Sequence, residues 1–211
     1  MAPTFADGRR WMLDGTKLML EAVSRLDEDG FAQPALLPGW TRKHLAAHLA
    51  ANADAVGNLI HWAATGIKTP MYASPAERAD GIAKGPAMST QELDSWLGIS
   101  AERLAEAMGR LTGQQWQQPV VTAQGRTVPA AETPWMRARE LCVHAVDFGV
   151  GITFADLPDG FNEALCDDIR IKRGLTDLPS EIAGAPLREV TAWLSGRPHN
   201  LTGIPELGPW L

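Results

Sequence analysis

The sequence lacks most of the features that would place a protein in a membrane, in an oxidising compartment or on nucleic acid. It has two cysteines, Cys142 and Cys166, which form neither a CxxC pair nor a disulfide framework. No apolar run approaches the roughly 18 residues of a transmembrane helix, and residues 1–10 lack the basic-then-apolar layout of a signal peptide. Lys and Arg total 19 against 25 Asp and Glu, with no basic block. We therefore expect a cytoplasmic protein with no nucleic-acid or membrane partner.

What the sequence does contain is enough apolar material for a packed core. Apolar residues make up 45% of the 211 positions and charged residues 21%, which suits one domain, or one domain with a small appendage. The 20 glycines and 15 prolines cluster between periodic segments. Tryptophan is frequent, at 8, while there is 1 tyrosine; an indole suits pocket walls and the ends of elements.

Helical spacing of apolar residues dominates the first 150 positions. Four long helices are predicted, over residues 8–26, 41–65, 90–111 and 133–150. Thr41 is a suitable N-cap for the second helix, and Thr133-Pro134 begins the fourth. Two short β-branched runs around Gln124-Gly125 predict a small hairpin within residues 119–129. After residue 150 we expect helices at 160–173 and 187–195, the latter ended by Gly196, and an extended tail. The pattern predicts an all-α fold, with region 1–150 followed by a short, mainly helical region 151–211.

The second helix directs one imidazole toward the core. At about 100° per residue, His48 falls within the apolar sector of this helix, and Asn52 follows one turn later. His44 lies toward the edge of the sector, and His61 points to the opposite side. His48 is therefore the histidine of this helix that the pattern places inside the protein.

The fourth helix carries an inward polar cluster. Glu140 and His144 are four residues apart and share one face, with Arg137 and Asp147 within about a turn of it. Cys142 projects from the other side and is a poor ligand candidate. Burying such groups together costs several kcal/mol unless they are paired or coordinate an ion.

Two interpretations of these polar residues follow. In the first, the carboxylate and imidazole of the fourth helix join the imidazole of the second in a three-ligand metal site with an open fourth position, as in catalytic zinc sites. In the second, Glu140 and His144 form an ordinary buried pair and His48 is a core histidine whose hydrogen bonds are satisfied. Spacing alone leaves both open.

Three motifs resemble those of a known family. Residues 37–49 (LPGWTRKHLAAHL), residues 125–129 (GRTVP) with 134–147 (PWMRARELCVHAVD), and residues 193–197 (WLSGR) are similar to motifs of the mycothiol-dependent maleylpyruvate isomerase family, within the DinB-like metalloprotein superfamily. The likeness covers residues 10–150 and one short patch afterwards.

The resemblance implies a DinB-like four-helix bundle in which His48, Glu140 and His144 hold a divalent metal, with zinc expected. It also implies mycothiol as a low-molecular-weight thiol at the open coordination position, where the metal favours the thiolate. In the family's isomerase, the thiolate adds to the alkene of maleylpyruvate, the resulting single bond rotates, and elimination gives fumarylpyruvate.

Four further residues have two possible roles each. Arg197, in the WLSGR element, is expected to hold a carboxylate of substrate or thiol, or else to be a plain helix C-terminal cation. Arg137 either binds ligand or pairs with Glu140 or Asp147. Asn52 lines the pocket or satisfies a buried carbonyl. Asp147 either orients His144 from behind or, three positions along the same helix, does not reach its free nitrogen.

The sequence departs from the family pattern in its C-terminal region, and this affects which substrate is expected. Full-length relatives carry strands between the bundle and the WLxGR helix, whereas residues 172–187 contain no convincing strand, so the C-terminal region 151–211 is expected to be shortened. The sequence thus favours a metal- and mycothiol-dependent isomerase acting on a small electrophile, monomeric or homodimeric. The alternatives are a mycothiol S-transferase that keeps the conjugate, a non-catalytic metal-binding bundle whose fourth position is closed by His44 or Asp147, and a structural helical domain without metal.

Overall fold

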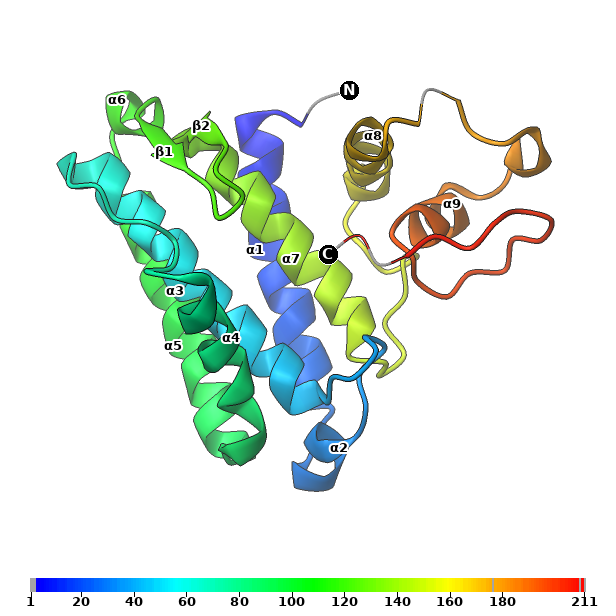
Figure 1. Cartoon of the computed structure of the whole chain (residues 1–211), viewed down its shortest axis with the longest axis horizontal. Helices are drawn as coiled ribbons and strands as arrows, with labels where there is room; N and C mark the ends of the chain where they lie inside the picture. The colour runs from blue at the N-terminus through cyan, green and yellow to red at the C-terminus, as the bar shows by residue number, and fades with distance from the viewer. Residues whose placement is uncertain (1–2, 176, 209, 211) are drawn as a thin grey trace.

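The chain folds mainly into helices (Figure 1). The computed structural model describes residues 3–175, 177–208 and 210. The four longest helices of its first part are α1 (Phe5–Ser24), α3 (Arg42–Thr65), α5 (Thr90–Gly109) and α7 (Thr133–Asp147). Helix α1 packs along α7, α3 packs along α5, and α3 also contacts α7. The predicted all-α class is confirmed, and each predicted long helix lies within a few residues of an observed one.

The helix that carries His48 begins where its sequence predicts. The Thr41 side chain accepts from the His44 backbone N–H, and the His44 ring nitrogen Nδ1 accepts from the Thr41 backbone N–H at 3.1 Å. This reciprocal cap satisfies two donors of the first turn of α3. The helix ends at Gly66, whose φ of 76° is the left-handed conformation that glycine adopts without strain.

Shorter elements connect the long helices, and several of them were not predicted. The short helices are α2 (Glu28–Ala32), α4 (Pro75–Ala83) and α6 (Gly113–Trp116), with 3-10 turns η1 (Gly85–Ala87) and η2 (Ala130–Glu132); a further 3-10 turn, η3 (Ser180–Ile182), lies in the C-terminal region. The predicted hairpin is confirmed as β1 (Pro119–Val121) and β2 (Thr127–Pro129), antiparallel with Val120 opposite Val128. Its turn includes Gly125 at φ 78°.

Helices α1 and α7 approach closely because α1 presents glycine to α7. A Cβ atom on Gly15 would lie 2.8 Å from Cys142 Sγ and 3.0 Å from Leu141 Cβ. One on Gly8 would lie 3.1 Å from the Trp135 backbone nitrogen. This close contact holds α7, and with it Glu140 and His144, against the core.

The C-terminal region packs beside α1 and α7 (Figure 1). It contains α8 (Phe161–Arg173) and α9 (Leu187–Leu194), with no strand between them among the residues described. The predicted stop at Gly196 is confirmed: its φ is 69°, and a Cβ there would collide with the Gly208 carbonyl. The Trp11 indole N–H donates to the Asp159 carbonyl at 3.0 Å and ties this region to α1.

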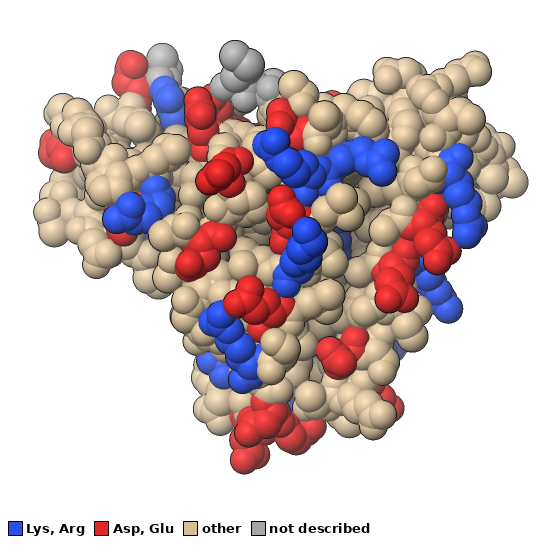
Figure 2. Space-filling view, turned by 180° about the vertical axis from the view of Figure 1, so that it is seen from behind, with Lys and Arg blue, Asp and Glu red and all other residues tan. Residues whose placement is uncertain are grey.

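The surface carries mixed charge. On the face shown in Figure 2, acidic and basic side chains are interspersed rather than separated into blocks. Within the described residues, no helix is both long and apolar enough to cross a membrane.

Candidate metal centre

One side chain of α3 and two of α7, which lie about 90 positions further along the chain, meet at one point between these helices. His48 Nε2 lies 3.0 Å from Glu140 Oε2, and His144 Nε2 lies 3.3 Å from the same oxygen. The two imidazole rings are perpendicular, with centroids 5.1 Å apart. One ligand atom from each residue lies within 4.8 Å of the other two. The structure thus brings together the three residues that the sequence singled out.

Burial and mutual hydrogen bonding set the electrostatics of this cluster. Burial lowers the pKa of His48 and outweighs the opposing hydrogen bond to Glu140. For His144, burial also favours the neutral form, but hydrogen bonds to Asp147 and Glu140 together raise its pKa above 6.5. Burial works to raise the pKa of Glu140, yet the hydrogen bonds from both histidines hold that pKa well below 4.5. The carboxylate is therefore ionised and flanked by two imidazoles of different basicity.

Asp147 reaches His144 from one turn along the same helix. Its Oδ2 lies 2.7 Å from His144 Nδ1, and both side chains are buried. A buried carboxylate at that nitrogen holds the proton on Nδ1 and leaves Nε2 free to bind an ion. Asp147 in turn accepts from Arg197, whose Nε and Nη2 lie 3.1 Å and 2.8 Å from its two oxygens. In this structure Arg197 therefore binds the carboxylate of Asp147.

Arg137 and Asn52 form a separate buried pair. Arg137 Nη1 donates to Asn52 Oδ1 at 2.7 Å and to the Leu49 carbonyl at 2.9 Å. The expected hydrogen-bonded pairing of Arg137 with Glu140 or Asp147 is not the one found, because the guanidinium reaches across to α3 instead. Burial lowers the pKa of Arg137 to about 10. Asn52 also lines the pocket described below, and the buried carbonyl here, that of Leu49, is satisfied by Arg137 rather than by Asn52.

The remaining histidines and the cysteine of α7 stay outside the cluster. His44 is engaged in the cap of α3, His61 is exposed, and Asp147 contacts the outer nitrogen of His144. Cys142 is buried, and burial raises its pKa. Among the residues described, the group of His, Cys, Asp and Glu side chains able to bind a metal has three members, and neither His44 nor Asp147 is one of them.

These three residues fit a divalent metal. A tetrahedral ion bound at about 2.0–2.2 Å holds its donors about 3.3–3.6 Å apart. The spacings of 3.0 and 3.3 Å between the two histidine nitrogens and the carboxylate oxygen are close to that separation. Two imidazoles with a carboxylate also form a known ligand set of catalytic zinc. The buried acceptor behind His144 is the usual outer partner of a ligating histidine.

The cluster lies at a pocket of about 380 Å³. His48 and Glu140 line it, whereas His144 is buried beneath the surface with 2% of its area exposed. The hairpin turn, residues 122–126, contributes another part of the lining, and Tyr72 adds the phenol ring of the loop before α4. A ligand in this pocket therefore reaches the His48 and Glu140 side of the metal centre.

Cations surround this pocket. Arg78 from α4, Arg126 from the hairpin, Arg139 from α7 and Lys172 from α8 line it, with Glu140 as its acidic lining residue. Asp168 partly neutralises two of them, lying 2.7 Å from Arg139 Nη1 and 2.8 Å from Lys172 Nζ. The excess of positive charge favours an anionic ligand.

The C-terminal tail returns to the same pocket. The Trp210 indole lines it, with the Arg139 guanidinium 5.2 Å and the Lys172 ammonium 5.0 Å from its ring centroid. The Trp210 backbone N–H donates to the Ser195 carbonyl at 3.2 Å. The C-terminal region thus supplies both a charged and an aromatic part of the lining.

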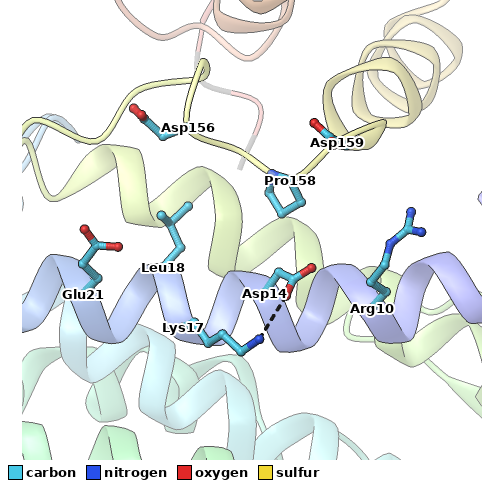
Figure 3. Close-up of a pocket in the computed structure, with 8 residues that line it drawn as sticks. All are labelled: Arg10, Asp14, Lys17, Leu18, Glu21, Asp156, Pro158 and Asp159. Carbon is cyan, nitrogen blue, oxygen red and sulfur yellow. Dashed lines mark hydrogen bonds and ion pairs between the residues drawn. The ribbon is translucent and has the colours of Figure 1, made fainter.

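A second hollow, of about 430 Å³, lies between α1 and the loop that precedes α8 (Figure 3). Its lining mixes Arg10 and Lys17 with Asp14, Glu21 and other acidic residues. It contains no imidazole and none of the residues of the metal centre. Its chemistry therefore does not add to that of the three-residue cluster.

Comparison with known proteins identifies the family. Residues 13–149 match the model of the mycothiol maleylpyruvate isomerase N-terminal domain. The chain belongs to this family. A crystal structure of a mycothiol-dependent maleylpyruvate isomerase is similar at 34% identity and a TM-score of 0.90, over 99% of this chain and 100% of that one. The structure of a histidine-to-alanine mutant of that isomerase matches equally well. No curated protein matches.

Family membership confirms the resemblance drawn from the three motifs. The structure also adds pocket residues that the sequence did not indicate, notably Arg78, Lys172 and Trp210. None belongs to one of the three motifs, and each comes from a different element. No local signal in the sequence joins them, because their proximity depends on the folded arrangement of α4, α8 and the tail.

Proposed function

We propose that this protein is a metal- and mycothiol-dependent isomerase that converts the cis double bond of a small, anionic electrophile, maleylpyruvate or a close analogue, to the trans form. The observation that carries this proposal is the convergence of His48, Glu140 and His144 at a pocket lined by cations. Membership of the isomerase family supports it. The divalent ion is proposed to be zinc, because the donor set is two nitrogens and one oxygen.

The proposed chemistry requires a thiolate close to an alkene. When bound, the metal supplies a lowered thiol pKa at its open coordination position. Addition of the thiolate to one alkene carbon would form a carbon–sulfur bond and move the π electron pair onto the conjugated carbonyl as an enolate, leaving a carbon–carbon single bond that can rotate. Return of that electron pair would break the carbon–sulfur bond, release the same thiolate and restore the double bond in the trans form. The thiol is thus regenerated, and no oxidant or reductant is consumed.

The residues of this chain orient the partners of that reaction. Glu140 and His48 form the ligand side that faces the pocket, while Asp147 fixes the ring of His144 from behind. Arg78 and Lys172 lie where they attract the carboxylates of an anionic substrate. A substrate held by its carboxylates keeps its alkene near the metal centre while the central bond rotates.

The test uses protein purified without an affinity tag and loaded with one zinc per chain. The protein is incubated with mycothiol and maleylpyruvate, and substrate, product and free thiol are measured together. The proposal predicts fumarylpyruvate formation with free thiol unchanged, and loss of both turnover and bound zinc in His48→Ala. Stoichiometric thiol consumption would instead establish an S-transferase. Zinc binding without turnover of either kind would leave a non-catalytic metal-binding protein.

Two broader properties belong to the same proposal. We place the enzyme in the cytoplasm, since its two cysteines are unpaired and buried, as is usual in reducing compartments. We propose a monomer or homodimer, because each chain contains all three metal ligands.

A further inference from the structure

A continuous series of buried polar contacts runs from the end of α9 to the metal centre. Arg197 contacts both oxygens of Asp147, and Asp147 contacts His144 Nδ1 at 2.7 Å. The exposed fractions of these three side chains are 2%, 0% and 3%. Such short contacts between buried charged groups are strong and oriented. The series joins the C-terminal region to a metal ligand of α7.

The end of α9 fixes the position of the Arg197 guanidinium. Arg197 Nη1 donates to the Ser195 carbonyl at 2.6 Å, and its backbone N–H donates to the Ala192 carbonyl at 2.9 Å. Between these residues, Gly196 adopts a positive φ and leaves no room for a Cβ. The guanidinium is therefore held by the WLSGR turn and by its bonds to Asp147.

The effect of Arg197 on Asp147 reaches the metal ligand. A guanidinium bonded to both carboxylate oxygens fixes the plane of the carboxylate, and the carboxylate fixes the rotation of the His144 ring. His144 then presents Nε2 toward Glu140 Oε2, 3.3 Å away. Without Arg197, the carboxylate loses its partner on the side away from the metal.

We propose that Arg197 is a positioning residue that sets metal affinity through Asp147 and His144, and so couples the seating of the C-terminal region to metal binding. This inference rests on the metal site of the proposed function. By linkage, an effect of α9 on metal affinity implies an equal effect of the metal on the seating of α9. The same region carries Lys172 and Trp210 of the pocket, so metal binding also stabilises the pocket wall.

The first test is zinc affinity, measured by competition with a chromophoric chelator on the folded, full-length protein. Arg197→Gln is expected to weaken zinc binding about 10- to 100-fold, the range typical of partners behind a metal ligand. Arg197→Lys keeps the charge but loses the contact with both carboxylate oxygens, so its zinc affinity is expected to lie between those of Arg197→Gln and wild type. If Arg197→Gln does not fold, Arg197→Lys takes its place in the test. The matched control is Arg110→Gln, which removes the same charge from an exposed ion pair with Glu106, 3.0 Å away on α5, and touches neither Asp147 nor the C-terminal region. Its zinc affinity is expected to stay within about twofold of wild type.

The second test follows the coupling in reverse. Zinc is expected to slow amide hydrogen exchange in residues 187–197 of the wild type, and to do so much less in Arg197→Lys. The inference is overturned if folded Arg197 variants bind zinc like wild type and lose only thermal stability, or if zinc leaves exchange at 187–197 unchanged. Failure of the wild type to bind zinc at all would instead refute the proposed function.

Discussion

Gly15 allows α1 to approach α7, and replacing it with alanine isolates the cost of that approach. The new Cβ would lie 2.8 Å from Cys142 Sγ and 3.0 Å from Leu141 Cβ. Both neighbours have 0% exposure, so neither can move into solvent. Because α7 carries Glu140 and His144, this contact also supports the metal centre.

Two opposing effects set the size of the change. Alanine in a helix interior is favoured over glycine by about 0.5–1 kcal/mol, while inserting a methyl group into a packed core costs about 1–3 kcal/mol. Gly57, inside α3, has no atom within 4 Å of its ideal Cβ, so Gly57→Ala retains the helix gain alone. The free energies of unfolding of the two variants should therefore differ by about 1–3 kcal/mol, the packing cost.

The measurement is urea denaturation of metal-free wild type, Gly15→Ala and Gly57→Ala at one pH and temperature. We expect Gly57→Ala to be more stable than wild type and Gly15→Ala to be less stable. Adding Cys142→Ala to Gly15→Ala removes the closest atom, so the two substitutions together should cost less than the sum of their separate effects. Equal stabilisation by both glycine substitutions would refute the close packing of α1 on α7.

Three other predictions concern the site and its surroundings. Because the pKa of His144 is raised, its pairing with Asp147 and Glu140 stabilises the metal-free protein below pH about 6.5, and this stabilisation is lost as the pH rises through the raised pKa. Zinc affinity should rise over the same pH range because the ion displaces protons. Denaturation and chelator-competition titrations at the same series of pH values will check both. Arg78→Gln should raise the KM for an anionic substrate about tenfold, the effect of losing about 1.4 kcal/mol of charge-assisted binding, with zinc content unchanged; a change in zinc content with no change in KM would contradict the assigned role. Cys142, buried and with a raised pKa, should resist thiol reagents in the native protein and react only on unfolding, as mass spectrometry will show.

The sequence singled out the three residues of the candidate metal centre because each lies on a long helix with clear periodicity. His48 falls in the apolar sector of α3, and Glu140 and His144 share one face of α7. Helical spacing determines these directions locally. That the three atoms meet required the packing of α3 on α7, which the family resemblance implied and spacing alone left open.

Contacts that depend on loops were beyond prediction from the sequence. Arg197 and Asp147 are 50 positions apart, separated by α8, η3, α9 and the loops between them, so no periodicity relates them. Asp147 Oδ2 lies 2.7 Å from His144 Nδ1, whereas helical spacing predicts the face on which a side chain lies and not how far it reaches along the helix. The short helices α2 and α4 were not predicted either, since helices of 5 and 9 residues have little periodicity of their own.

The most direct test of the proposed thiol-activating metal centre is X-ray absorption at the zinc edge of the reconstituted protein, with and without mycothiol. We predict one zinc per chain bound by nitrogen and oxygen donors at about 2.0–2.2 Å, and one sulfur scatterer at about 2.3 Å once the thiol is added. In His144→Ala, both the zinc and the sulfur signal should be lost. A zinc environment that mycothiol leaves unchanged, with no sulfur at bonding distance, would contradict the proposal.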